Sequence, residues 1–212
     1  DGMLLNIQNN EIWVKIIGEF NAYNLLAIYS TSIELGLDNN QVLEKISVLN
    51  PAEGRFHTVR NSENITGIVD YMHTPDAYKN VLSTINSIRT NTEKLIMVFG
   101  CGGDRDAEKR SKMTAIACNM SDQVIITADN PRKEKIEDII SDMTAKLDPV
   151  QKKKVLVITD RSQAIKTACT LASDGDIVLL AGKGHEKYQE IKGVKHYFDD
   201  VKELVESLNI NQ

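Results

Sequence analysis

Charged side chains of both signs gather in a few short segments of the sequence. The segment Asp129–Arg132, which reads DNPR, holds a carboxylate, an amide and a guanidinium. A guanidinium can bind a carboxylate through two parallel hydrogen bonds, and a carboxylate can pair with an ammonium group. Arg132 and Asp129 together could therefore bind a zwitterion, such as a free amino acid.

DNPR also has a purely structural interpretation. Asn130 suits the N-cap of a helix and Pro131 suits its first turn, so the pattern predicts a helix over Pro131–Leu147. This interpretation leaves Arg132 unexplained, because a cation in the first turn opposes the helix dipole at a cost of about 0.3–1 kcal/mol. The position of this charge favours a carboxylate-binding role for Arg132.

Three further segments carry polar or charged side chains after an apolar run. Gly100–Asp106 reads GCGGDRD and combines glycines, which let a backbone approach a ligand closely, with the charge of Arg105. Gly182–Glu186 reads GKGHE, and His73 lies in DYMHTPDA close to Asp70. Each segment by itself is equally compatible with an ordinary loop whose charges are solvated.

Several catalytic motifs are absent from the sequence. It contains no GxxxxGK[ST] phosphate loop and no GxSxG nucleophile elbow, and its four histidines show no paired spacing. A triphosphate-binding loop, a serine hydrolase and a zinc site are therefore not indicated, and we expect no metal-binding residues in this chain.

From about residue 53 onwards, apolar runs alternate regularly with helical patterns. Short continuous apolar runs between helices are typical of a parallel sheet covered on both faces. The predicted fold class is therefore α/β, a Rossmann-like, doubly wound, mostly parallel sheet. Ligands bind such a sheet outside the carboxyl ends of its strands, which is where the polar segments lie. The predicted strands are ITGIVDY, KLIMVFG, QVIIT, VLVIT and DIVLLAG, followed by an edge hairpin in EIKGVKHYF and a last helix in DDVKELVESL.

Residues 1–52 show a different pattern. They predict a β-hairpin that turns at Gln8–Glu11, a helix stopped by Gly36, and a second helix that ends before Pro51. A hairpin and two helices make a small core for an independent domain. We therefore expect residues 1–52 to be the end of a domain whose earlier part is absent, and residues 53–212 to form a second, complete domain.

The composition argues against several classes of protein. The 212 residues carry a formal net charge of −5, which argues against nonspecific nucleic-acid binding. No apolar run approaches the roughly 18–20 residues of a membrane span, and the chain opens without a signal-peptide pattern. Cys101, Cys118 and Cys169 lack CxxC spacing, which indicates reduced thiols. We expect a cytoplasmic protein with no nucleic-acid or membrane partner.

Six segments together resemble one known family. GEFNAYNLLA, GRFHTV, DYMHTPDA, VFGCGGDRDAEKR, TADNPRKE and AGKGHEKYQ occur in this order in the Mur ligases. Each segment alone is modest, but the ordered set covers the chain from Gly18 to Asp200. The resemblance implies that residues 1–52 are the C-terminal end of the central ATP-binding domain. Residues 53–212 would then be the C-terminal glutamate-ligase domain, which binds the amino acid.

The resemblance also implies an activity. Similar Mur ligases with DNPR add meso-diaminopimelate to UDP-N-acetylmuramoyl-L-alanyl-D-glutamate in peptidoglycan synthesis. ATP and Mg²⁺ serve to activate the substrate carboxylate as an acyl phosphate, which the incoming amine attacks. The P-loop and the magnesium-binding acids of the family are absent from these residues. We therefore assign no catalytic residue, and we expect this chain to be a monomer that is inactive by itself.

The family motifs imply ligand contacts residue by residue. Arg132 would select diaminopimelate, because a guanidinium suits the carboxylate on the second stereocentre, which lysine lacks. The implied diaminopimelate-binding residues are Arg105, Asp129, Asn130, Arg132, Gly182 and Glu186. The implied ATP contacts are Asn21 and Asn24 at the adenine, Arg55 and His73 at the phosphates, and Asp70 at the ribose.

Two alternatives stay open. The first is a non-catalytic module that binds an amino acid or a nucleotide, and it differs from the ligase in having no preference for meso-diaminopimelate over L-lysine. The second is a folate-type polyglutamate ligase, which shares the DxxHxP loop. DNPR together with GKGHE argues against this second alternative.

Overall fold

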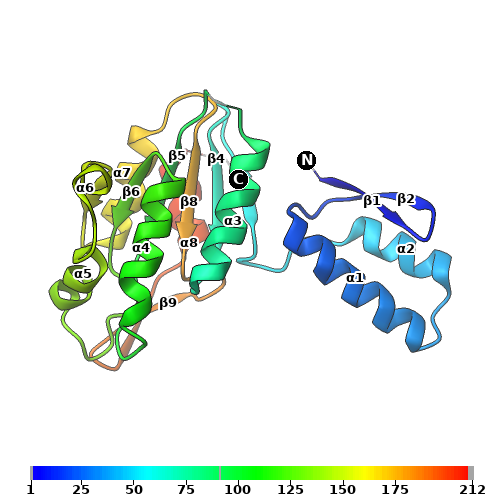
Figure 1. The fold of residues 1–212 in the computed structure, drawn as a ribbon, viewed down its shortest axis with the longest axis horizontal. Helices are drawn as coiled ribbons and strands as arrows, with labels where there is room; N and C mark the ends of the chain where they lie inside the picture. Colours follow the sequence, from blue (N-terminus) through cyan, green and yellow to red (C-terminus); the bar gives the residue numbers. More distant parts are fainter. Residues whose placement is uncertain (1, 91, 210–212) are drawn as a thin grey trace. The chain divides into compact units, whose positions relative to one another are not determined.

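The computed structural model describes residues 2–90 and 92–209. It divides into two compact units, one ending at Ala52 and the other beginning at Glu53. In Figure 1 the smaller unit is coloured from blue to light cyan, and the larger one continues from cyan through green and yellow to red.

The smaller unit is a β-hairpin packed on two helices. Strands β1 (Met3–Ile7) and β2 (Asn10–Val14) pair in antiparallel fashion, and the residues between them, Gln8 and Asn9, have φ values of 49° and 66°. Left-handed φ at two successive residues is the geometry of a tight hairpin turn, so the predicted hairpin is confirmed.

Both predicted helices of the smaller unit are also present. Helix α1 (Glu19–Glu34) ends just before Gly36, whose φ is 83°, and α2 (Asn39–Val48) begins at an N-cap supplied by Asp38. The core of this unit consists of Val14, Leu25, Tyr29, Val42, Leu43 and Ile46.

The larger unit is built on a six-stranded sheet with the order β3-β4-β8-β5-β6-β7. All neighbouring pairs run parallel except β3 and β4, so the predicted mostly parallel sheet is confirmed. The strands are β3 (His57–Arg60), β4 (Thr66–Asp70), β5 (Leu95–Phe99), β6 (Gln123–Ile126), β7 (Val155–Val157) and β8 (Ile177–Ala181).

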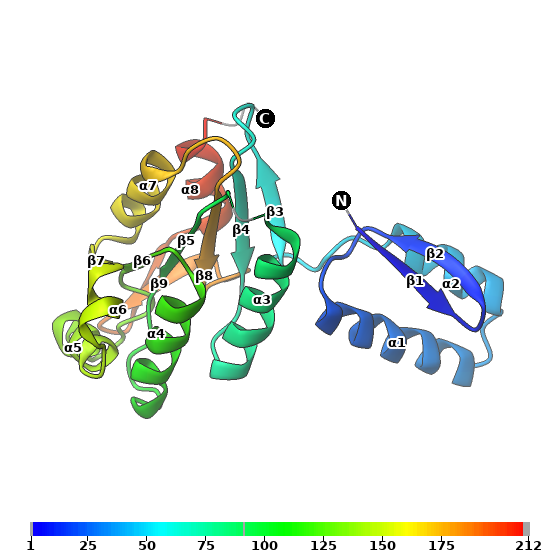
Figure 2. The same cartoon turned by 45° about the horizontal axis from the view of Figure 1, so that its top comes forward.

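The edge strand β3 was not predicted. Its four residues, HTVR, alternate between half-buried and exposed and lack the continuous apolar run of the inner strands. It pairs with β4 alone in this sheet and is visible beside it in Figure 2. An edge strand that is half solvated has little sequence signal, because burial on both faces is what makes strands continuously apolar.

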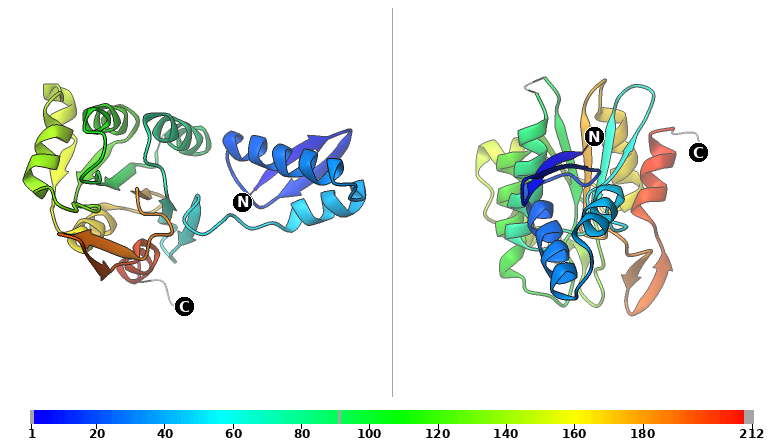
Figure 3. Two further views of the ribbon diagram at one scale, coloured as in Figure 1. Left: turned by 90° about the horizontal axis from the view of Figure 1, so that it is seen from below. Right: turned by 90° about the vertical axis from the view of Figure 1, so that its right-hand side faces the viewer.

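Helices cover both faces of the sheet. Figure 3 shows α3 (Pro75–Ile88) and α4 (Glu108–Met120) on one face, and α7 (Arg161–Leu171) and α8 (Asp200–Ser207) on the other. Residues of β5 alternate between the two layers. Ile96 and Val98 belong to the core cluster that includes residues of α7 and α8. The ring of Phe99 meets Tyr78 of α3 edge-on at 5.4 Å.

The helix after β6 does not start where the sequence indicated. Helix α5 spans Ile136–Thr144 with Lys135 at its N-cap, so Asn130 is not a cap and Pro131 is not in a first turn. Arg132 instead has a φ of 51° and forms a parallel bridge with Ile191. The prediction of a helix from Pro131 was wrong, because backbone pairing with a distant strand outweighs the local helix signal.

The same pairing involves a second small sheet. Strands β9 (Tyr188–Ile191) and β10 (Val194–Tyr197) form an antiparallel hairpin that is separate from the six-stranded sheet. The hairpin was predicted correctly, but its expected place at the edge of the main sheet was wrong. One further short helix, α6 (Pro149–Lys153), follows α5 and begins with a capping box at Asp148.

The described residues lack two kinds of feature. In residues 2–90 and 92–209 there is no helix with the length and apolar character needed to cross a membrane. The same residues contain no group of three or more His, Cys, Asp or Glu side chains arranged to hold a metal ion.

Candidate ligand-binding site

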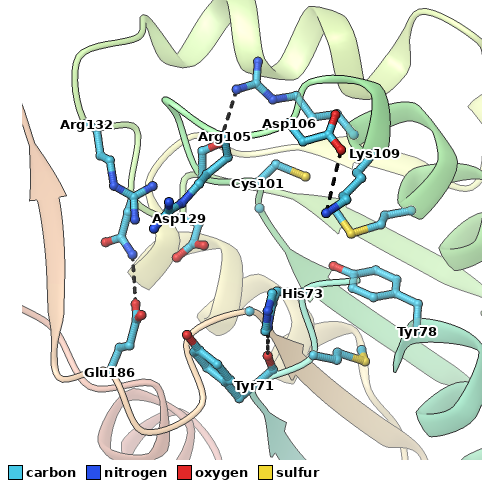
Figure 4. A pocket seen from close by; sticks show the side chains of 17 residues that line it. Tyr71, His73, Tyr78, Cys101, Arg105, Asp106, Lys109, Asp129, Arg132 and Glu186 are labelled. Carbon is cyan, nitrogen blue, oxygen red and sulfur yellow. Dashed lines mark hydrogen bonds and ion pairs between the residues drawn. The ribbon is translucent and has the colours of Figure 1, made fainter. Parts of the chain in front are cut away.

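The loops after β4, β5, β6 and β8 enclose a pocket of about 350 Å³ at the carboxyl edge of the sheet. A volume of this size suits a small molecule. Figure 4 shows Arg105, Arg132 and Asp129 toward one side of the pocket, and Tyr71, His73 and Tyr78 toward the other. The lining includes all six residues predicted to hold an amino acid, namely Arg105, Asp129, Asn130, Arg132, Gly182 and Glu186.

Asn130 joins three segments behind the pocket. Its side chain is 2% exposed, and its Oδ1 accepts hydrogen bonds from Lys183 Nζ at 3.0 Å and from the backbone N–H of Glu190 at 2.9 Å. Its Nδ2 donates to Glu186 Oε2 at 2.9 Å, the dashed line beside Glu186 in Figure 4. Asn130 therefore orients Glu186 within the pocket.

Arg132 is held at its backbone and at its side chain. Its N–H donates to the carbonyl of Glu190 at 3.0 Å, and its own carbonyl accepts from Lys192 N–H at 2.7 Å. The guanidinium donates from Nη1 to Gly103 O at 2.8 Å, and its Nε lies 3.5 Å from Glu190 Oε2. These bonds leave Nη2 unused among the described residues, and the side chain, which lines the pocket, is 19% exposed.

The charges of the pocket are only partly balanced within the chain. Asp129 Oδ1 lies 3.1 Å from Lys183 Nζ, so a lysine of the chain already provides Asp129 with an ammonium group. Arg105 lines the pocket and is exposed. The charged groups that line the pocket include the guanidinium groups of Arg105 and Arg132 and the carboxylate of Glu186.

Two glycines of GCGGDRD allow close packing between two loops of the chain, whereas the sequence suggested close approach to a ligand. A Cβ added to Gly100 would lie 2.3 Å from Thr127 O, and one added to Gly103 would lie 2.0 Å from Pro131 O. These glycines are needed because the loop after β5 packs directly against the backbone of the DNPR segment. The close backbone approach is therefore between two loops of the chain.

Arg110 is a pocket residue that the sequence did not single out. Its side chain is only 2% exposed, and it binds Glu134, Asp142 and the carbonyl of Gly102. Hydrogen bonding to Glu134 raises the pKa of Arg110, and the same contact lowers the pKa of Glu134. In the sequence, Arg110 is one charge of a polar helix start, so only its tertiary contacts distinguish it from a solvated residue.

The residues predicted to contact ATP are not brought together in this pocket. His73 lines it, whereas Arg55 and Asp70 lie outside its lining, and Asn21 and Asn24 belong to α1 of the smaller unit. Asn21 Nδ2 donates to Ile17 O at 2.8 Å, and Asn24 Nδ2 donates to Asn21 Oδ1 at 3.0 Å. The predicted ATP contacts of all five residues stay predictions.

Asp70 has a clear structural role. It is 3% exposed, and its two oxygens accept the backbone N–H groups of Phe56 and Met72, each at 2.8 Å. Burial raises the pKa of Asp70, although these two hydrogen bonds oppose the shift. The carboxylate thus fixes the loop after β4 to the segment before β3.

The cysteine that lines the pocket has the properties of a core residue. Burial raises the pKa of Cys101 to about 12, with the nearby Asp129 carboxylate adding to the shift. Cys118 and Cys169 are also buried free thiols whose pKa values are raised by burial. A thiol that stays protonated is a poor nucleophile, so these cysteines are not candidates for covalent chemistry.

The parallel sheet, with the charged pocket at its carboxyl edge, places the larger unit in the doubly wound α/β class. Comparison with known proteins places it more closely. The family described as Mur ligase, glutamate ligase domain, matches residues 54–184.

Curated and solved relatives agree with this match. The UDP-N-acetylmuramoyl-L-alanyl-D-glutamate--2,6-diaminopimelate ligase of Cytophaga hutchinsonii is 52% identical over 210 residues, covering 98% of this chain and 43% of that relative. A solved structure of a ligase with the same name superposes with a TM-score of 0.71 at 41% identity, over 97% of this chain and 42% of its own. The chain belongs to the Mur ligase family. It spans less than half the length of these ligases.

A third relative shares the fold at a greater distance. Folylpolyglutamate synthase of Mycobacterium tuberculosis superposes with a TM-score of 0.65 at 21% identity, over 82% of this chain and 39% of its own. At this identity the likeness concerns the fold alone.

Proposed function

We propose that this chain supplies the amino-acid-binding domain of an ATP-dependent ligase that joins meso-diaminopimelate to UDP-N-acetylmuramoyl-L-alanyl-D-glutamate. The relatives that match nearly the whole chain carry this activity in their names. The reaction would belong to cytoplasmic peptidoglycan synthesis. The larger unit would be the glutamate-ligase domain, and the smaller unit the end of the ATP-binding domain.

The observation that carries the proposal is the pairing of charges in the pocket. Arg132 and Arg105 offer guanidinium groups, and Glu186 offers a carboxylate oriented by Asn130. The distal centre of meso-diaminopimelate carries one carboxylate and one ammonium group. We assign the carboxylate to the two arginines and the ammonium to Glu186, with Asp129 lining the pocket beside them as the partner of Lys183.

In this assignment the chain's residues bind and orient the amino acid. Holding the distal centre fixes the other end of the molecule, whose amine is the nucleophile of the proposed reaction. ATP supplies the activation of the substrate carboxylate when it is bound to the whole ligase. The residues of this chain would thus act by positioning the nucleophile, and we assign them no proton transfer.

The exposed groups near the pocket fit a nucleotide phosphate. The guanidinium of Arg55 lies 5.0 Å from the ring centre of Tyr71, and the ring of His73 lies 4.9 Å from the same ring. Both side chains are exposed, so they could reach a phosphate group. We assign no Mg²⁺ ligand to this chain.

The experiment that tests this function is calorimetric titration of the 212-residue chain with meso-diaminopimelate and with L-lysine. Diaminopimelate should bind more tightly by roughly tenfold or more, because a hydrogen bond to a charged group contributes about 1.5–3 kcal/mol. Arg132→Ala should remove most of this difference. The exposed neighbour Lys133, changed to alanine, is the matched control and should leave it intact.

An activity assay covers the case in which binding by the chain alone is too weak to measure. This chain can replace the corresponding part of the Cytophaga hutchinsonii ligase, because the match between them covers 98% of this chain. The chimera should use meso-diaminopimelate and reject L-lysine. Equal use of both amino acids would contradict the proposed specificity.

A further inference from the structure

Lys183 is a fully buried lysine that the proposed chemistry does not use. Its side chain is 0% exposed, and it lies in GKGHE immediately beyond the end of β8. Lysine is almost never fully buried unless its charge is paired. Its position beside the pocket therefore calls for a specific reason.

The ammonium group of Lys183 meets three acceptors. Nζ lies 2.7 Å from Tyr188 O, 3.0 Å from Asn130 Oδ1 and 3.1 Å from Asp129 Oδ1. The contacts to Tyr188 and Asn130 are hydrogen bonds, and the contact to Asp129 is an ion pair. The acceptors come from the loop after β6 and from the first residue of β9, two segments that are far apart in the sequence.

Lys183 is the cation that pairs with Asp129. Arg161 lies nearby, but it forms a buried ion pair with Asp200, with Nη2 and Oδ2 separated by 2.7 Å. Asp129 Oδ1 is buried and accepts no hydrogen bond within the described residues. The ammonium of Lys183, 3.1 Å away, is its ion-pair partner. Burial lowers the pKa of Lys183, and the Asp129 carboxylate opposes this shift.

Lys183 is also linked by hydrogen bonds to Glu186 and Arg132, the residues proposed to bind the amino acid. Through Asn130, it supports the side chain that orients Glu186 and that accepts the N–H of Glu190. Glu190 in turn accepts the N–H of Arg132 at its carbonyl. One buried cation is therefore connected to Glu186 through two hydrogen bonds and to Arg132 through three.

We propose that Lys183 is a positioning residue for amino-acid selection: its ammonium holds Asp129, Asn130 and the start of β9 together and so sets the geometry of Arg132 and Glu186. Lys183 does not touch the amino acid in this scheme, since it is absent from the pocket lining. The selectivity part rests on the proposed function, whereas the positioning part concerns the chain itself.

The test replaces Lys183 with methionine, which is unbranched and apolar and keeps most of the side-chain volume. Lys195→Met is the matched control, because Lys195 lies over the ring of the same Tyr188, at 4.1 Å, but is exposed on β10. Circular dichroism first establishes that both variants are folded. Lys183→Met combined with Asp129→Asn is the second variant, and it removes the carboxylate that the first variant leaves unpaired.

The first readout is amide hydrogen exchange and needs no ligand. In Lys183→Met, the N–H groups of Glu190 and Arg132 should exchange faster by roughly tenfold or more, because their acceptors lose their support. The control should leave both unchanged. The double variant should regain thermal stability relative to Lys183→Met but keep the faster exchange. Unchanged exchange at both amides would overturn the positioning role, whatever the ligand is.

The second readout is the ratio of the dissociation constants for L-lysine and meso-diaminopimelate. Lys183→Met should lower this ratio, while a variant that is merely less stable would bind both ligands with the original ratio once folded. An unchanged ratio with altered exchange would limit Lys183 to a structural role. If the wild-type chain and the chimera both fail to distinguish the two amino acids, the proposed function is wrong, and the exchange experiment still decides the positioning role.

Discussion

The guanidinium of Arg110 binds the carboxylate of Glu134 through two parallel hydrogen bonds, Nη1 to Oε2 and Nη2 to Oε1, each 2.8 Å long. Arg110 lies on α4, and Glu134 lies in the loop between DNPR and α5. The same guanidinium bonds to Gly102 O in the loop after β5. The pair therefore ties together the two loops that carry Arg105 and Arg132.

Arg110→Met should destabilise the chain by about 1–3 kcal/mol. The substitution removes charge-assisted hydrogen bonds and leaves the Gly102 carbonyl without its donor, but the freed carboxylates are partly solvated, which limits the cost. Urea unfolding measures the effect. Lys109→Met is the matched control, since Lys109 is the neighbouring residue and its exposed ion pair with Asp106 is worth little. Equal losses in both variants would contradict the role given to Arg110.

The folded state should become less stable at acidic pH, because Glu134 becomes protonated. Hydrogen bonding to Arg110 holds the pKa of Glu134 below its ordinary value of 4.5. The folded state therefore binds this proton less readily than the unfolded state, so the contribution of Glu134 is complete above the unfolded pKa and lost as pH falls through the folded pKa.

Unfolding measured at a series of pH values checks this sign. The difference in stability between the wild type and Glu134→Gln should be largest above pH 4.5 and should shrink below it. The Asp142 carboxylate also accepts a hydrogen bond from Arg110, and this bond is common to both proteins. A difference that does not change with pH would show that the charge of Glu134 is unimportant.

Gly103→Ala should destabilise the chain by about 1–3 kcal/mol, because its Cβ would overlap the carbonyl of Pro131 and one of the two packed loops must move. Gly102→Ala is the comparison. Its Cβ would meet Nη1 of Arg132 at 2.8 Å, and the end of a flexible side chain can shift. Thermal unfolding should separate the two variants, with Gly103→Ala lower. The reverse order would mean that the loop backbones are not in firm contact.

The 212-residue chain should show no ligase turnover by itself, because its sequence lacks a phosphate-binding GxxxxGK[ST] loop. Phosphate release from ATP is measured with meso-diaminopimelate and the UDP-sugar dipeptide present. The chimera with the Cytophaga hutchinsonii ligase serves as the active control. Turnover by the isolated chain would require a nucleotide site made from residues that we have not assigned.

Much of the larger unit could be predicted from local pattern. Continuous apolar runs gave β4, β5, β6 and β8 because these strands are buried on both faces. Pro75 and Asp160 also marked helix starts correctly. In contrast, β3 was missed, because a half-solvated edge strand has no such pattern.

The site was predictable in composition but not in arrangement. Polar residues after several strands predicted a cluster at one sheet edge, and the six residues expected to hold an amino acid do line one pocket. Their partners were not predicted. Lys183 was one of the polar residues expected at this edge and Arg110 one charge of a polar helix start, and only contacts between distant segments show both to be buried.

The sequence by itself determined the parallel sheet, most of its helices and the edge at which the polar loops collect, because these follow from local periodicity and burial. The tertiary structure decided what DNPR does. A local rule made Asn130 and Pro131 a helix start, yet Asn130 bonds to Lys183 and Arg132 pairs with β9. Hydrogen bonds to segments about 50 to 60 residues away outweigh a cap worth about 1 kcal/mol, and no local pattern can reveal them.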